Sequence, residues 1–141
     1  MTAEPILLKI RTTQMVPGDP PEIMELQSEG TMTRYDDRVE LSYIETEMTG
    51  LEGVATTFTA YTDGTVVLTR EGEKLRSRMR FSLNEKDDSL YDIGFGALLL
   101  TVTARRIQID WVRHTLEVEY GVEVEHSPMG TNIYHVEYRP L

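Results

Sequence analysis

The chain has 141 residues, 40% hydrophobic and 27% charged, an ordinary composition for a soluble protein and enough for one domain over residues 1–141. Its formal net charge of −10 argues against nucleic acid as a partner, because phosphate backbones bind clusters of Lys and Arg. With no cysteine, disulfides and thiolate chemistry are excluded.

The composition also predicts where the protein resides. The lack of cysteine fits a reducing cytoplasm. No apolar run approaches the ~20 residues of a membrane-spanning helix. An acid precedes the short apolar stretch near the N-terminus, which does not fit a secretory signal. We therefore expect a cytoplasmic protein without a membrane partner.

The first third of the chain predicts strands around a proline-rich loop. Ile6 to Gln14 alternates apolar and polar residues, the period of a half-buried strand. Val16 to Pro21 contains three prolines and is expected to be a loop. The residues from Glu22 to Tyr35 are compatible with a strand. A short helix capped by Asp19 is the alternative over Glu22 to Gln27.

The stretch from Val39 to Gly72 predicts a meander of three antiparallel strands. Glycines and polar residues between Thr49 and Gly53 favour the first reversal. Asp63-Gly64 separates two runs rich in Thr, Phe, Tyr and Val, which predicts a hairpin with a type I′ turn. Strands this short and this close together favour a barrel or a sandwich.

The remaining chain predicts four more regions of strand. Lys74 to Leu83 alternates cleanly, and His114 to Glu125 does the same. The apolar alternation of Ala97 to Trp111 slips by one residue at Arg105-Arg106, which predicts a β-bulge. We expect a turn at Ser127 to Gly130 and a last strand over Ile133 to Arg139.

Four segments carry a resemblance to a known family. ELQSEGTM (residues 25–32), LSYIETEMTGLEGVATTF (41–58), LTREG (68–72) and SRMRF (77–81) resemble the YwiB-like family of uncharacterised bacterial proteins. The resemblance implies an all-β fold, a single antiparallel lipocalin-like (calycin) β-barrel of about eight to ten strands with little helix. It favours a strand over Glu22 to Tyr35, and it implies no catalytic or binding residue. We expect the first and last strands to pair and close the barrel.

A basic stripe is unusual in so acidic a chain. Arg76, Arg78 and Arg80 alternate with apolar residues, and together with Lys74 they define the stripe. One hypothesis is a face that binds anions, since Arg grips carboxylates and phosphates in a bidentate fashion. Another is an outward strand whose charges pair with the acids of residues 117–125. A third places one or two of these arginines at the mouth of the barrel.

The aromatic residues supply the other candidate contacts. Seven tyrosines, seven methionines, three phenylalanines and one tryptophan could line an apolar pocket or fill the barrel. Candidate ligand contacts are Tyr43, Phe58 and Trp111, together with the three arginines. The three histidines lack metal-ligand spacing, and no nucleophile or phosphate-loop motif occurs, so we expect neither a metal nor another cofactor.

These observations rank three hypotheses for the function. The first is non-catalytic binding of a small apolar or amphipathic ligand, including an anionic one, in the barrel or its mouth. The alternative is a filled barrel that acts as a protein-interaction module or a homodimer. An enzyme ranks third, because the chain contains no motif with a known mechanism.

Overall fold

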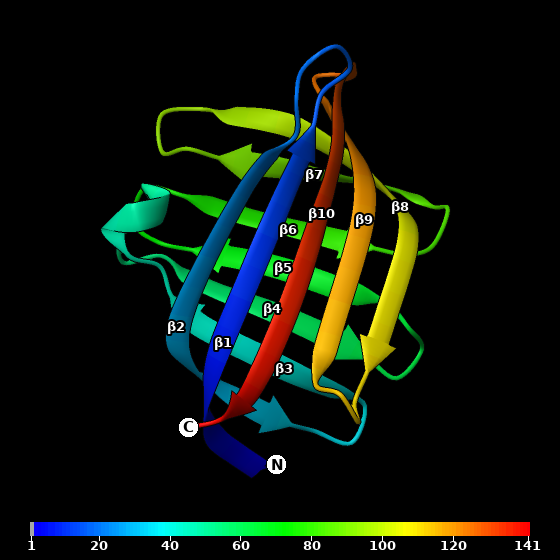
Figure 1. Cartoon of the computed structure of the whole chain (residues 1–141). Coiled ribbons are helices and arrows are strands. Elements are labelled where there is room, and N and C mark those ends of the chain that lie inside the picture. Colours follow the sequence, from blue (N-terminus) through cyan, green and yellow to red (C-terminus); the bar gives the residue numbers. More distant parts are fainter. Residues whose placement is uncertain (1) are drawn as a thin grey trace.

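The computed structural model describes residues 2–141, and within them ten strands form a closed antiparallel barrel (Figure 1). The barrel closes where β1 pairs with β10, as predicted. The strands around the barrel follow chain order, and a single 3-10 turn, η1 (Glu47–Thr49), interrupts them. The strands are β1 (Thr2–Met15), β2 (Glu22–Arg34), β3 (Arg38–Ile44), β4 (Ala55–Tyr61), β5 (Val66–Glu71), β6 (Arg76–Phe81), β7 (Lys86–Asp92), β8 (Ala97–Asp110), β9 (Thr115–Val124) and β10 (Ser127–Pro140).

The barrel is flattened into two layers that cross each other. Figure 1 shows β1, β2, β9 and β10 running along the front, nearly perpendicular to β3, β4, β5 and β6 behind them. Side chains from the two inner faces fill the space between such crossed layers. Among the described residues, no helix has the length and apolar character needed to span a membrane.

Alternating residues of the strands build the core, as the two-residue period predicts. Phe81 and Tyr120 pack with ring centroids 4.6 Å apart, and Phe58 meets Tyr134 edge to face at 5.5 Å. These rings fill the middle of the barrel. The other fully buried side chains include Ile6, Leu8, Ile10, Val66, Leu68, Val102, Val118 and Val136.

The predicted β-bulge and the hairpin at Asp63-Gly64 are confirmed, but the type of that turn and the position of a second predicted turn are wrong. The register between β8 and β9 shifts between Ala104 and Arg106, which leaves Arg105 as the extra residue. At Asp63-Gly64 only Gly64 has a positive φ, and its N–H donates to the carbonyl of Tyr61, so the turn is not type I′. The loop centres on Thr62-Asp63 instead, with Gly64 in the left-handed conformation after it.

The two residues before Ser127 form the turn expected at Ser127 to Gly130. Glu125 and His126 have φ of 49° and 68°, and Ser127 already pairs with Val124 in the β9–β10 ladder. A two-residue loop with both φ values positive is the type I′ geometry, whose twist matches that of the flanking strands. The structure therefore adopts this turn without the glycine or asparagine that usually marks it in a sequence.

The ladder between β2 and β3 is short. The two strands pair only from Thr31–Ser42 to Arg34–Val39, whereas β2 pairs with β1 along its whole length. At Gly30, just before this ladder, a Cβ atom would lie 2.3 Å from the carbonyl oxygen of Ser42. Only glycine therefore allows so close an approach of the two backbones. Beyond Gly30 the strands separate, and a cavity opens between them.

Candidate functional site

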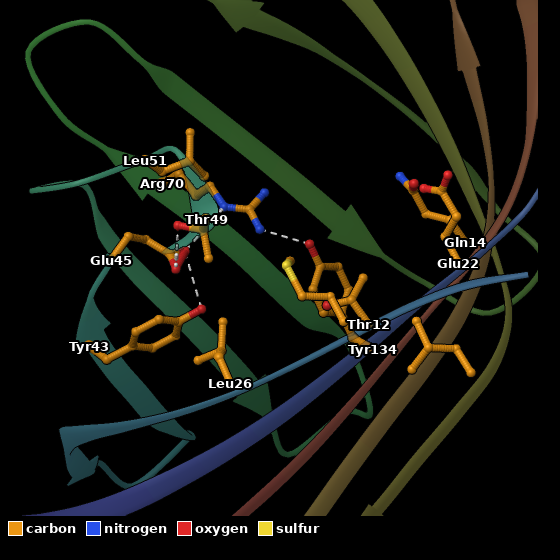
Figure 2. Close-up of a pocket in the computed structure, with 12 residues that line it drawn as sticks. Thr12, Gln14, Glu22, Leu26, Tyr43, Glu45, Thr49, Leu51, Arg70 and Tyr134 are labelled. Atoms are coloured by element: carbon orange, nitrogen blue, oxygen red, sulfur yellow. Dashed lines mark hydrogen bonds and ion pairs between the residues drawn. The ribbon is translucent and has the colours of Figure 1, made fainter. Parts of the chain in front are cut away.

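A cavity of about 530 Å³ lies where β2 separates from β3, and we call it the mouth cavity (Figure 2). One part of its wall is apolar and another is polar. Its lining residues come from β1, β2, β3, β5 and β10 and from the segment that joins β3 to β4. They are Thr12, Gln14, Glu22, Ile23, Met24, Leu26, Tyr43, Glu45, Thr49, Leu51, Arg70 and Tyr134.

The polar wall forms because the inward faces of several strands change from apolar to polar near the mouth. Leu41 and Tyr43 are buried, and two residues further along the chain Glu45 lies on the same side. On β5, Val66 and Leu68 are buried, and Arg70 continues their face. The alternation that builds the core thus also directs the Glu45 carboxylate and the Arg70 guanidinium into the barrel.

Glu45 is a buried carboxylate whose hydrogen bonds are largely satisfied. The residue is 4% exposed. Its Oε2 accepts hydrogen bonds from Thr56 Oγ1 at 2.9 Å and from the Tyr43 hydroxyl at 3.2 Å, and Thr49 Oγ1 lies 3.5 Å from Oε1. Such bonds offset the cost of removing the charge from water. The carboxylate therefore links the side chains of Tyr43, Thr49 and Thr56.

Arg70, by contrast, has N–H donors that form no hydrogen bond within the described protein. Its Nη2 donates to the Tyr134 hydroxyl at 2.7 Å, and its Nε lies 4.0 Å from Glu45 Oε2 (Figure 2). That Nε is buried and has no hydrogen-bond partner among the described residues. A guanidinium carries five N–H donors, so most of them are unused by the protein. The wall of the cavity therefore presents a cation that can still bind acceptor atoms.

Neighbouring groups fix the protonation states of the polar wall. Burial raises the pKa of Tyr43, and the charge of Glu45 adds to the effect, so this hydroxyl keeps the proton that it donates. Burial alone would lower the pKa of Arg70. Its contacts with Tyr134, Tyr43 and Glu45 outweigh burial and raise that pKa, so the guanidinium stays charged.

Two of the predicted contact residues lie at or near the cavity, and the others do not. Tyr43 lines it, and Phe58 is buried behind it against Tyr134. Trp111 follows β8 in a turn, is 43% exposed and is not among the lining residues. The three arginines Arg76, Arg78 and Arg80 are all exposed on the outer face of β6 and do not line the cavity either.

The pairing of this basic stripe with the acids of residues 117–125 is wrong. β6 lies between β5 and β7, whereas the acids lie on β9. Glu117 instead contacts Arg106 at 2.7 Å and His135 at 3.0 Å, and Glu123 lies 3.7 Å from Lys86. Sequence alternation gives the face of a strand, but it does not say which strands are neighbours.

Glu45 and Arg70 are the site residues that sequence reasoning missed. A signal was present, because each occupies the apolar parity of its strand, where a charge is costly unless it is paired. Elsewhere, His135 lies between Glu117 and Glu137 on the outer surface. Within residues 2–141, no group of three or more His, Cys, Asp or Glu side chains is arranged to hold a metal.

Comparisons with known proteins agree with the fold but indicate no activity or ligand. A family model described as a domain of unknown function, DUF1934, matches residues 8–136. The crystal structure of the ywiB protein from Bacillus subtilis superposes with a TM-score of 0.76 at 22% sequence identity. The match covers 96% of this chain and 92% of that chain. A search of curated proteins found no match.

Proposed function

This chain belongs to the DUF1934 family, which is described as a domain of unknown function. Because that family indicates no activity, we propose a function from the geometry of the mouth cavity. The cavity binds a small amphipathic molecule, and the protein acts as a non-catalytic binding protein. The head of the ligand is a hydrogen-bond acceptor with a single negative charge, such as a carboxylate. Its tail is apolar.

The unused donors of Arg70 carry the proposal. Glu45 already accepts bonds from Tyr43 and Thr56, so the site lacks acceptors for Arg70 rather than donors for Glu45. A carboxylate is planar and fits the fork of a guanidinium. A group with two negative charges fits less well, because the Glu45 carboxylate lies only 4.0 Å from Arg70 Nε and would repel the second charge.

The apolar residues of the lining suit an apolar tail. Leu26, Met24 and Leu51 line the cavity, and Ile23 lies at its outer rim with 63% of its surface exposed. A volume near 530 Å³ falls within the range of about 300–1,000 Å³ found for small-molecule sites. Burying a methylene group of the ligand's tail contributes about 0.8 kcal/mol, so an alkyl tail of several carbons adds appreciable affinity.

The test is isothermal titration of the delipidated protein with decanoate. We expect saturable binding that Arg70→Met weakens at least about tenfold, which corresponds to roughly 1.4 kcal/mol. Arg78→Met is the matched control, because it removes the same charge from the exposed outer face of the adjacent strand. It should bind decanoate like the parent protein.

A second variant separates loss of the anchor from loss of the fold. Leu26→Trp fills the apolar part of the cavity and leaves Arg70 and Glu45 in place. It should abolish binding while the circular dichroism spectrum stays unchanged. Binding that survives both Arg70→Met and Leu26→Trp, or no binding to the parent protein, would contradict the proposal. Decanol that binds as tightly as decanoate would contradict the role given to Arg70.

A further inference from the structure

One side of β2 has no strand beside it. Residues 22–30 pair with β1, and pairing with β3 begins only at Thr31. We call this segment the open β2 edge. It is the outer strand of the front layer in Figure 1. Within the described chain, no strand pairs with these residues on the side away from β1.

The hydrogen-bonding pattern shows which residues face the open side. Tyr35 N–H donates to the carbonyl of Arg38 at 2.8 Å and closes the β2–β3 hairpin. Antiparallel pairs alternate between bonded and non-bonded positions, so Thr33 and Thr31 direct their backbone groups toward β3. By the same alternation Glu29, Gln27, Glu25 and Ile23 direct their N–H and C=O groups to the open side. A segment of about 30 Å, at roughly 3.3 Å per residue, is therefore available for pairing.

The two faces of this edge differ in chemistry. Met24 and Leu26 point toward the mouth cavity, which they line. Glu25, Gln27 and Glu29 are exposed on the outer face. Glu29 has Leu7 as its cross-strand neighbour on β1, so no cation lies directly opposite it, whereas Glu25 lies opposite Arg11. The edge thus combines unpaired backbone, an apolar inner row and an acidic outer row.

We propose that the open β2 edge binds an extended basic segment of a partner protein by strand addition. Alternate residues of the segment are apolar and face Met24 and Leu26, while those between them are Lys or Arg and face Glu25 and Glu29. Backbone bonds supply affinity in this mode, and alternate side chains supply specificity. The inner row of this edge, Met24 and Leu26, also lines the mouth cavity, whereas its backbone groups and outer acids belong to the edge alone.

Charge selects this occupant over a second copy of the chain. Two β2 edges paired with each other would bring two acidic rows together, and each chain already carries a net charge of −10. Like charges on neighbouring strands destabilise a sheet. A basic segment is attracted instead, and the attraction also speeds its encounter with the protein.

The test uses a fluorescein-labelled, eight-residue peptide of alternating lysine and valine. Fluorescence anisotropy measures its binding to the protein. Gln27→Pro removes one N–H that faces the open side, a change that edge strands tolerate, and it keeps the charge of the protein. We expect it to weaken peptide binding at least about tenfold, which corresponds to roughly 1.4 kcal/mol. Because the charge is unchanged, the loss separates strand addition from general attraction to an acidic surface.

Further variants make the outcome decisive. Glu29→Lys should also weaken binding without touching the backbone, and circular dichroism should show that both variants are folded. The peptide assay is independent of decanoate binding, so failure of the cavity proposal would not affect this one. Binding that Gln27→Pro leaves intact would overturn the inference. So would equal binding of an alternating glutamate–valine peptide, or a dimer of the free protein that Gln27→Pro dissociates.

Discussion

Arg70 Nη2 and the hydroxyl of Tyr134 lie 2.7 Å apart, and their hydrogen bond joins β5 to β10 inside the barrel. The two strands are not neighbours in the sheet, so no backbone ladder connects them. Side chains alone hold the two walls of the mouth cavity together at this point. The bond also fixes the guanidinium where it can meet a ligand.

Replacing Tyr134 with phenylalanine should destabilise the protein. The variant removes the acceptor of Arg70 Nη2 and leaves a buried donor unpaired, which costs about 1–3 kcal/mol. Tyr138→Phe is the matched control, because the buried Tyr138 hydroxyl has no partner within residues 2–141. Urea unfolding should show a lower midpoint for Tyr134→Phe and no loss for Tyr138→Phe. Equal losses in the two variants would contradict this account of the bond.

The acid and the base of the site should depend on each other. Glu45→Leu removes the charge that faces the buried Arg70, and breaking such a pair costs about 3 kcal/mol or more. The double variant Glu45→Leu with Arg70→Met removes both charges and should recover most of that loss, since apolar pairs often replace buried ion pairs without cost. A double-mutant cycle in urea measures the coupling. Additive losses would show that the two side chains act independently.

Several features of this fold follow from local sequence pattern alone. The alternation of Lys74 to Leu83 correctly separates the two faces of β6, and the structure buries Met79 and Phe81 and exposes the arginines. The slip at Arg105-Arg106 correctly predicts the bulge, because a single extra residue reverses every later side chain. Both depend only on residues that are close together in the chain.

The site could not be predicted as completely, because it depends on contacts between distant strands. The parity of Glu45 and Arg70 marks each as an inward charge, but their approach depends on the pairing of Tyr43 with Thr56 and of Thr56 with Arg70. The opening beside β2 depends on where its ladder with β3 stops, and that point is set by packing around Gly30. The Glu125-His126 turn was missed because neither residue is typical of its geometry.

The protein should lose stability in alkaline solution through its buried tyrosines. Burial raises the pKa of Tyr43, assisted by the Glu45 charge, and burial also raises the pKa of Tyr120. In the unfolded chain a tyrosine loses its proton near pH 10, an approximate reference value, while the folded chain keeps both protonated. The stabilisation is complete below that pH. Above it the unfolded state binds fewer protons, so the free energy of unfolding falls by up to about 1.4 kcal/mol per pH unit for each tyrosine.

Urea unfolding across this pH range tests the effect directly. The midpoint should be steady below about pH 9 and should decline above about pH 10. In Tyr43→Phe the decline should be shallower, because one of the titrating tyrosines has been removed. The comparison is of slopes, so a lower starting stability from the lost hydrogen bond to Glu45 does not affect it. A double variant of Tyr43 and Tyr120 with the same slope as the parent protein would assign the decline to other groups.

Gly30 should tolerate no side chain, because it lies where β2 leaves β3. A Cβ there would lie 2.3 Å from the carbonyl oxygen of Ser42 and 2.8 Å from Leu8 Cδ1. The Leu8 side chain can rotate, but the Ser42 backbone belongs to the short ladder that closes the barrel on this side. Gly30→Ala should therefore lower the free energy of unfolding by about 1–3 kcal/mol or more, the usual cost of forcing atoms into a packed site.

Gly96→Ala provides the control for this prediction, since a Cβ at Gly96 meets no atom within 4 Å. Urea unfolding should therefore show a loss for Gly30→Ala only. Hydrogen exchange should also become faster at Thr31 and Thr33, because the strain is released by opening their ladder with β3. Faster exchange throughout the chain would indicate general unfolding, and unchanged exchange at these two residues would show that β2 can shift without loosening the closure of the barrel.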